Sequence, residues 1–140
     1  MQRLNTCWIT LRQRRQLLSE ILGYQLADST EILLPFYSDY GRNIKIGKNV
    51  SISCNVMMAD KGGIEINDNV KIGAGVSLQT VDGDITKPIV IDEGARIGGN
   101  ATILPGVHIG ANAVVGAGVI ITHDLPTGEH VSYQQGGIQR

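Results

Sequence analysis

Aromatic residues make up only 4% of the 140-residue sequence, which has one Trp, four Tyr and one Phe. So few rings point to a narrow core that aliphatic side chains fill. Cysteine is as scarce, and Cys7 and Cys54 are too few for a disulfide framework. Residues 1–15 contain no apolar run of signal-peptide length, and no stretch is long enough to span a bilayer. We therefore expect a single-domain cytoplasmic protein with no membrane partner.

The sequence also lacks a large excess of basic or acidic residues. The sequence has 12 Lys and Arg against 13 Asp and Glu, a formal net charge of −1. Its densest basic group, Arg12, Arg14 and Arg15, is interpreted as the solvated face of a helix. Because a nucleic-acid-binding protein needs clustered cations to neutralise phosphates, we do not expect nucleic acid as a partner.

What the sequence does contain is a six-residue repeat between Ile91 and Asp124. Every sixth residue is Ile or Val, and Ala or Val follows four positions later, as in Ile91-Asp-Glu-Gly-Ala95-Arg. A helical period of 3.6 residues would scatter these side chains around the helix. Each hexad instead predicts one short strand plus a corner, and a stack of such units is a β-helix. Glycine, at 18 of 140 residues, suits the tight corners of such a solenoid.

The same pattern continues upstream with two interruptions. Apolar residues recur at six-residue intervals from Ile46 to Ile64, and a second run extends from Ile66 to Leu78. The first break is a slip of two residues around positions 60–63, and the second separates Leu78 from Ile91. Because the interior of a coil tolerates no insertion, both breaks predict loops that leave the solenoid.

The chain is divided into residues 1–43 (N-terminal helix and connector), 44–126 (hexapeptide-repeat β-helix) and 127–140 (C-terminal tail). A capping box formed by Thr10 and Gln13 opens a helix that we expect from Leu11 to Leu22. Gly23 is its expected stop. We predict that this helix caps the open end of the solenoid core.

Three segments carry a resemblance to a known family: SDYGRNIKIGKNVSISCNVMMAD, KIGAGVSL and IGGNATILPGVHIGANAVVGAGVIITHDLP. They resemble the hexapeptide-repeat acetyltransferases, and within these the maltose/galactoside O-acetyltransferase group. The resemblance implies an all-β solenoid, a left-handed parallel β-helix with three hexads in each triangular coil. It also implies a homotrimer, with acetyl-CoA as co-substrate in the groove between neighbouring subunits.

Carried over position by position, the resemblance implies a largely retained cofactor side. Small residues that would line the pantetheine groove are Gly73, Gly99 and Ala117. Thr122 matches a family threonine at the end of the last full coil, and His123 replaces the lysine that usually follows it. A histidine at this position weakens the attraction for phosphate at neutral pH.

The acceptor side differs more from the family pattern. Family positions that contact the sugar fall on Asp39, Ser51, Ser53 and Lys61, where the family typically has an aromatic residue at 51, Asn at 53 and an acid at or beside 61. Asp60 is the candidate for that acidic role. The aligned place of the catalytic histidine is Gly83, and the loop that follows is short. Loss of a positioned base costs about 10²–10⁴-fold in rate, and His123, Asp82 and Asp84 are the weak substitutes.

The remaining histidines and the outward apolar residues concern assembly. His108 occupies an outward slot and is interpreted as a surface or trimer-contact residue, and His130 lies in the tail. The spacing of these histidines does not match a metal site, so no metal is expected. Val90, Val114 and Ile120 are apolar residues beyond the inward slots, and their need for cover favours a trimer.

Two functions therefore remain open. The first is a CoA-dependent O-acetyltransferase for a saccharide or another small hydroxyl acceptor, with altered catalytic machinery. The second is a non-catalytic β-helix trimer that serves as a scaffold or binds CoA without turnover. The retained cofactor side favours the first, and the missing histidine favours the second.

Overall fold

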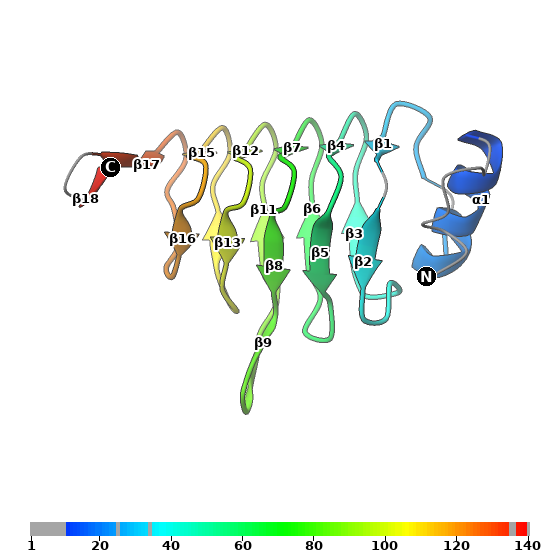
Figure 1. The fold of residues 1–140 in the computed structure, drawn as a ribbon, viewed down its shortest axis with the longest axis horizontal. Coiled ribbons are helices and arrows are strands. Elements are labelled where there is room, and N and C mark those ends of the chain that lie inside the picture. Colours follow the sequence, from blue (N-terminus) through cyan, green and yellow to red (C-terminus); the bar gives the residue numbers. More distant parts are fainter. Residues whose placement is uncertain (1–10, 25, 34, 135–136, 140) are drawn as a thin grey trace.

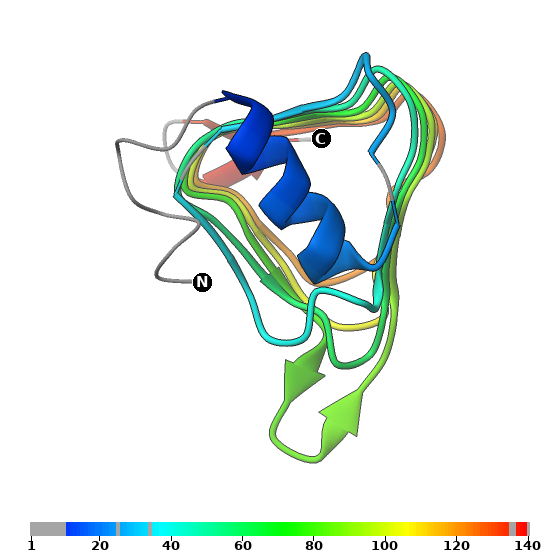
Figure 2. The ribbon, with the colours of Figure 1, turned by 90° about the vertical axis from the view of Figure 1, so that its right-hand side faces the viewer.

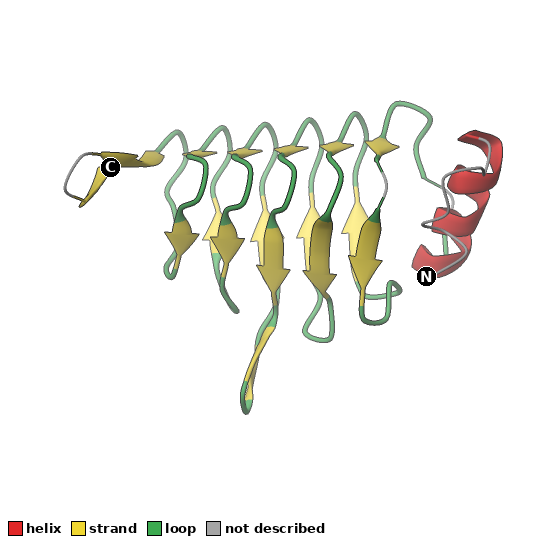
Figure 3. Ribbon diagram, in the orientation of Figure 1, coloured by secondary structure: helices red, strands yellow, loops and turns green. Residues whose placement is uncertain are grey.

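A computed structural model describes residues 11–24, 26–33, 35–134 and 137–139. One helix, α1 (Leu11–Leu22), is followed by short strands, β1 to β18. The strands stack into a row of coils, with α1 at the N-terminal end of the row (Figure 1). The described elements are almost entirely strands and turns (Figure 3). None of the described helical residues forms a span long and apolar enough to cross a bilayer.

Successive coils place their strands in three sheets, which we name A, B and C. Sheet A contains β1 (Glu31–Ile32), β4 (Ser51–Ile52), β7 (Lys71–Ile72), β12 (Arg96–Ile97), β15 (Val114–Val115), β17 (His130–Gln134) and β18 (Gly137–Gln139). Sheet B contains β2 (Phe36–Ser38), β5 (Val56–Ala59), β8 (Ser77–Gln79), β13 (Thr102–Ile103) and β16 (Ile120–Ile121). Sheet C contains β3 (Ile44–Ile46), β6 (Ile64–Ile66), β11 (Ile89–Ile91) and β14 (His108–Ile109). Apart from the antiparallel pair β17–β18, neighbouring strands in these sheets are parallel, and the coils have a triangular outline (Figure 2).

The hexad pattern explains this arrangement because its two apolar slots point into the triangle. Between Ile91 and Ile121, every Ile, Val and Ala in these slots has a relative exposure of 3% or less. The register stacks like residues, so that Ile97 lies between Ile72 and Val115 in sheet A. The core is therefore a continuous aliphatic column, as the sequence predicted.

The corners of the coils require residues with positive φ. Along the edge where sheet C passes to sheet A, this position is taken by Asn49, Asn69, Gly94, Asn112 and Gly128. The side chains of Asn49 and Asn69 form a ladder, in which Asn49 Nδ2 donates to Asn69 Oδ1 at 2.7 Å. At Gly94, the amide oxygen of Asn112 lies where a Cβ atom would stand. Asparagine and glycine are thus matched between neighbouring coils, since each tolerates this conformation.

Both predicted breaks leave the solenoid between sheets B and C. The first forms a tight turn at residues 60–63, which precedes β6 and leaves both Ile64 and Ile66 buried. The second is a hairpin of β9 (Val81–Asp82) and β10 (Ile85–Thr86), which projects from one corner of the triangle (Figure 2).

Helix α1 lies across the N-terminal end of the core (Figure 2), where Leu18 and Leu22 are buried. Its predicted end at Leu22 is confirmed, and the amide of the following residue, Gly23, donates to Ser19 O at 2.9 Å. The Thr10 side of the capping box lies outside the described residues. Arg15 is not on a solvated face, which corrects the prediction, because its guanidinium donates to Thr30 O and Ala27 O at 2.8 Å each.

Tyr24 fixes the chain that follows the helix. Its hydroxyl donates to Ile44 O at 3.1 Å and accepts from Ile46 N at 2.7 Å. Burial raises the pKa of the Tyr24 phenol above its usual value, and the hydrogen bond from Ile46 opposes this in smaller part.

The sheets extend beyond the predicted β-helix range of 44–126 at both ends. On the N-terminal side, β1 and β2 pair with β4 and β5. On the C-terminal side, β17 pairs with β15, and Val131 is 5% exposed. Parts of the predicted connector and tail thus belong to the solenoid, because the inward slots continue at Ile32, Phe36 and Val131.

Candidate functional site

Most of the predicted cofactor and acceptor residues lie along two edges of the triangular prism. The A/B edge is the column of corners between sheets A and B, formed by residues 53–55, 73–76, 98–101 and 116–119. The B/C edge is the column between sheets B and C, formed by residues 39–43, 60–63, 80–88, 104–107 and 122–124. Sheet B separates the two edges.

The A/B edge holds the small residues of the predicted cofactor groove. Gly73, Gly99 and Ala117 come from three consecutive coils, at the same corner. At Gly73, a Cβ atom would stand 2.6 Å from Gly99 N, so coil stacking alone requires glycine there. Gly99 is less constrained, and Ala117 is exposed. Small residues therefore recur along this edge, among the exposed side chains of Asn55 and Asn100.

The other two predicted cofactor residues, Thr122 and His123, lie on the B/C edge. Both are exposed, and Thr122 Oγ1 is 3.3 Å from His123 Nδ1. Within one chain, sheet B lies between them and the Gly73–Ala117 strip. A single subunit thus does not bring the predicted cofactor residues together.

The predicted acceptor residues divide in the same way. Ser51 points outward from β4 of sheet A, and Ser53 lies at the A/B edge. Asp39, Asp60 and Lys61 lie at the B/C edge, where Asp39 and Lys61 are exposed. The acceptor set, like the cofactor set, is split between the two edges.

Asp60 has a structural task in the loop that carries Lys61. Its side chain is completely buried, and its two oxygens accept from Tyr40 N at 2.8 Å and Asn43 N at 3.2 Å. The carboxylate therefore ties two successive coils together at the B/C edge. The adjacent Lys61, in contrast to Asp60, has its charged group in solvent.

Gly83, the aligned place of the family histidine, lies at the tip of the β9–β10 hairpin. It has φ +60, as the first residue of a two-residue loop between Asp82 and Ile85. Asp82 and Asp84 are exposed beside it. His123 lies on the same edge two coils further on, about 10 Å away along the axis at the usual strand spacing.

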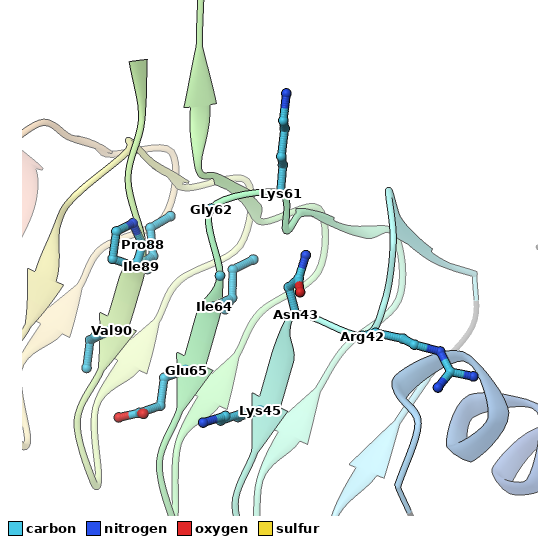
Figure 4. A pocket seen from close by; sticks show the side chains of 11 residues that line it. Arg42, Asn43, Lys45, Lys61, Gly62, Ile64, Glu65, Pro88, Ile89 and Val90 are labelled. Carbon is cyan, nitrogen blue, oxygen red and sulfur yellow. The ribbon is translucent and has the colours of Figure 1, made fainter. Parts of the chain in front are cut away.

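A pocket of about 380 Å³ lies on sheet C beside the B/C edge (Figure 4). We call it the sheet-C pocket; it is lined by Arg42, Asn43, Lys45, Lys61, Gly62, Gly63, Ile64, Glu65, Pro88, Ile89 and Val90. Lys61 rises from the rim, and Lys45 and Glu65 lie next to each other on neighbouring strands (Figure 4). Of these residues, the sequence singled out Lys61 as an acceptor contact. The pocket could not be recognised because its walls come from three coils.

His108 forms an interaction that the sequence did not indicate. Its Nε2 is 2.7 Å from Asp92 Oδ2, and its backbone amide donates to Asp124 Oδ1 at 2.8 Å. The His108 side chain is 51% exposed and points outward from sheet C, as predicted. His130 is exposed at the start of β17. Within the described residues, no group of His, Cys, Asp or Glu is arranged to hold a metal ion.

Exposed apolar side chains gather on sheet B and its two edges. In the described parts of the chain, six large apolar side chains are clearly exposed: Leu33, Tyr37, Tyr40, Met57, Ile85 and Ile120. Tyr37, Met57 and Ile120 are on sheet B, with exposures of 39%, 41% and 52%. Val90 and Val114, on sheets C and A, are partly buried. Among the described residues, sheet B is therefore the sheet whose strands carry clearly exposed large apolar side chains.

Comparison with known proteins agrees with this architecture. A family described as the hexapeptide repeat of succinyl-transferase matches residues 41–79 and 88–123. Nodulation protein L of Rhizobium meliloti is 38% identical over 125 residues, covering 81% of this chain and 68% of that protein. A Saccharomyces cerevisiae protein assigned provisionally to the acetyltransferases is 35% identical over 125 residues, covering 81% of this chain and 63% of that protein. The chain spans less than two thirds of the length of several such relatives.

Two solved structures are similar along most of the chain. A hexapeptide-repeat-containing acetyltransferase from Vibrio cholerae, complexed with acetyl coenzyme A, has a TM-score of 0.89 and 33% identity. That match covers 99% of this chain and 81% of the other. A galactoside acetyltransferase in complex with coenzyme A has a TM-score of 0.79 and 30% identity, covering 93% of this chain and 70% of the other.

Fold and repeat together define a β-helix protein built from hexapeptide repeats. More particularly, the chain belongs to the hexapeptide-repeat acetyltransferase family. The resemblance predicted from the three sequence segments is confirmed. The predicted fold class, a left-handed parallel β-helix with an N-terminal helix, is confirmed as well.

Proposed function

We propose that the chain is one subunit of a homotrimeric, acetyl-CoA-dependent O-acetyltransferase that acts on a saccharide or another small hydroxyl acceptor. The observation that carries this proposal is the division of the predicted site residues between the two edges that flank sheet B. The cytoplasmic location predicted from the sequence is part of the proposal.

A trimer with sheet B facing the three-fold axis would join the two halves. Each A/B edge would then meet the B/C edge of the next subunit, because these edges are the two ends of the inward face. Tyr37, Met57 and Ile120 would be buried near the axis, which removes apolar surface from water. Such a contact joins different surfaces of the two partners and closes into a ring.

The groove outside each contact would be the ligand site. One subunit would contribute Gly73, Gly99 and Ala117 with Ser51 and Ser53, and its neighbour would contribute Thr122, His123, Asp39 and Lys61. Asp60 would take part by shaping the loop that carries Lys61. Val90, which lines the sheet-C pocket, would lie on the same side of that groove.

Acetyl-CoA supplies an acetyl group activated as a thioester. The hydroxyl of the acceptor must lose its proton as its oxygen attacks, so the site needs a base. Gly83 offers none, and the candidates at the same edge are Asp82, Asp84 and His123. The two carboxylates are exposed, and a solvated carboxylate is a weak base for an alcohol. We therefore expect slow transfer to simple sugars.

The absence of a side chain at Gly83 also supports the second function, a trimer that binds CoA or a partner without turnover. The two functions share the cofactor groove and differ in catalysis. Binding and turnover must therefore be measured separately.

The cofactor groove is tested by filling it. Ala117→Trp places an indole on the A/B edge, and we expect acetyl-CoA binding to fall by at least about tenfold, a change of 1.4 kcal/mol. Ala111→Trp is the matched control, since it changes the same hexad position at the edge between sheets C and A. Calorimetric titration of both trimers gives the affinities. His123→Lys should tighten binding by up to about 1 kcal/mol, because it adds a permanent cation.

Release of the CoA thiol with a panel of sugars then measures turnover. Slow release that depends on an acceptor supports the transferase, and binding without release supports the non-catalytic trimer. Equal acetyl-CoA affinity in Ala117→Trp and the wild-type protein, or no binding to either, would disprove the proposed groove.

A further inference from the structure

The sheet-C pocket has an excess of positive charge. Its lining contains three cations and one carboxylate: Arg42, Lys45, Lys61 and Glu65. The Glu65 carboxylate accepts from Asn67 Nδ2 at 3.4 Å, and Lys45 stands directly opposite Glu65 in the β3–β6 register. Lys45 is therefore the cation that Glu65 faces in the register, which leaves Arg42 and Lys61 without an acidic cross-strand neighbour.

Arg42 is directed away from the pocket. Its guanidinium donates to Glu20 O at 3.3 Å, and its side chain extends toward α1 (Figure 4). Within the described residues, neither Lys45 nor Lys61 has a carboxylate at ion-pair distance. Lys45 stands opposite Glu65 in the β3–β6 register, whereas Lys61 lies at the rim, outside the strands. Lys61 is the cation of this pocket that remains available to a ligand.

The backbone on both sides of Lys61 is fixed. Asp60 is held by two backbone amides, and Gly62 N donates to Thr80 Oγ1 at 2.8 Å. Asp60 and Thr80 are both completely buried. The ammonium group therefore projects from a rigid base at the rim of the pocket, although its own stem is flexible.

We infer that the acceptor carries an anionic group, a carboxylate or a phosphate, and that Lys61 binds this group at the rim of the sheet-C pocket. The inference rests on the proposed function, because that function places the acceptor at this edge. An ammonium group is strongly hydrated, and a neutral ligand replaces the displaced water with hydroxyl dipoles alone. An anion also compensates the positive charge, because it accepts a charge-assisted hydrogen bond from the ammonium group.

The nucleotide phosphates of acetyl-CoA are a second possible source of the anion. The resemblance places them beside His123, in the fifth coil, whereas Lys61 belongs to the second. Three coils correspond to about 14 Å along the axis. The acceptor is therefore the better match for Lys61.

The test compares acceptors that differ in one charged group. The wild-type trimer, saturated with acetyl-CoA, is given D-glucose, D-glucuronate and D-glucose 6-phosphate, and both kcat/KM and calorimetric affinity are measured. We expect at least one of the two anions to exceed glucose by about tenfold or more in both quantities. Which anion is preferred distinguishes a carboxylate from a phosphate acceptor, and added salt should reduce the preference.

Variants at Lys61 then test whether this residue causes the preference for an anionic acceptor over glucose. Lys61→Ala should abolish it and Lys61→Glu should reverse it, with little change in acetyl-CoA affinity. Lys48→Ala removes the same charge at the edge between sheets C and A, outside the pocket, and should leave the preference unchanged.

The outcomes separate this inference from the proposed function. Turnover of glucose equal to that of both anions would overturn the inference and leave the transferase intact. Selective binding of an anion without turnover of any acceptor would support the inference and argue against the transferase. Weaker acetyl-CoA binding in Lys61→Ala, with unchanged acceptor preference, would assign the charge to the nucleotide and overturn the inference.

Discussion

Asp60 and Lys61 are adjacent in the sequence, yet their side chains lie in opposite environments. The Asp60 carboxylate is fully buried and accepts two backbone hydrogen bonds, whereas the Lys61 ammonium faces solvent. Sequence comparison with the family can assign the acidic role to Asp60 because it is one position away. The structure shows that a shift of one residue at this corner moves a charge from the surface to the interior.

Replacing Asp60 by alanine tests this structural task. Asp60→Ala removes the acceptor of the Tyr40 and Asn43 amides and empties the buried space that the carboxylate fills, so we expect a loss of about 3 kcal/mol in stability. At fixed protein concentration this corresponds to about 10 °C in melting temperature. Calorimetric melting provides the measurement.

Asp68→Ala is the control for this substitution. Asp68 also accepts a backbone hydrogen bond, from Lys48 N at 2.8 Å, but it is exposed, and water can replace it. Equal melting temperatures for the two variants would mean that the Asp60 contacts do not stabilise the loop.

At the scale of the element, each coil depends on corners that match those of its neighbours. Gly94 and Asn112 both have positive φ, at 76° and 59°, and the Asn112 side chain covers Gly94. A single coil therefore cannot be changed at this edge without affecting the next one. The pairing is a contact between residues 18 positions apart, the length of one regular coil.

A double-mutant cycle measures this match. Gly94→Ala should destabilise the protein by about 2 kcal/mol for two reasons. Alanine disfavours the left-handed backbone conformation of this position, and its Cβ would displace the Asn112 side-chain amide. Adding Asn112→Gly should recover part of that loss. Gly128→Ala is the control, with φ 75° but open space around the Cβ, and should cost less than Gly94→Ala. Chemical denaturation should show no recovery in the double variant if the contact is unimportant.

The hairpin carries Gly83, the position that the resemblance aligns with the family's catalytic histidine. Gly83→His places an imidazole at the exposed tip, at φ +60 and with nothing within 4 Å of its Cβ. Such a side chain has no support, and a misplacement of about 1 Å can cost 10²-fold. A positioned base raises the rate by about 10²-fold or more, and we expect the rate of CoA release in Gly83→His to rise by much less than this. Full rescue by this one substitution would show that the rest of the site is already organised.

The sequence predicts the interior of these elements well and the exterior poorly. From Ile91 to Ile121, the first inward slot accepts Ile or Val and the second accepts Ala or Val, so the six-residue period determines the strands, the corners and both breaks. The outward positions are less restricted by the fold. The neighbours of His108 and Lys61 come from other coils, and their distances cannot be obtained from spacing along one strand. Ile32 and Val131 lie in coils whose hexads are interrupted, which is why the sheets exceed the predicted boundaries.

At the scale of the whole molecule, the predicted site residues are divided between two edges that a single subunit does not bring together. The A/B and B/C edges are separated by sheet B in one chain, and the exposed Tyr37, Met57 and Ile120 lie between them. The proposed trimer explains both facts with a single contact. In that trimer the proposed function would depend on assembly, because each groove would take residues from two subunits.

A charge on sheet B should prevent this assembly. Ile120→Glu would bury a carboxylate in the proposed interface, so we expect the mass by light scattering to fall from three subunits of 15.0 kDa toward one. Arg96→Glu, on the exposed surface of sheet A, should leave the mass unchanged. A wild-type mass of one subunit, or no effect of Ile120→Glu, would exclude sheet B as the interface.

The most direct measurement is a crystal structure of the protein grown with saturating acetyl-CoA. We predict one acetyl-CoA in each groove between subunits, with its pantetheine chain along Gly99 and Ala117 of one subunit. Its nucleotide should lie beside Thr122 and His123 of the neighbour, and its thioester should face the β9–β10 hairpin. Acetyl-CoA bound at the edge between sheets C and A, or contacting one subunit alone, would show that the two halves of the site do not meet as proposed.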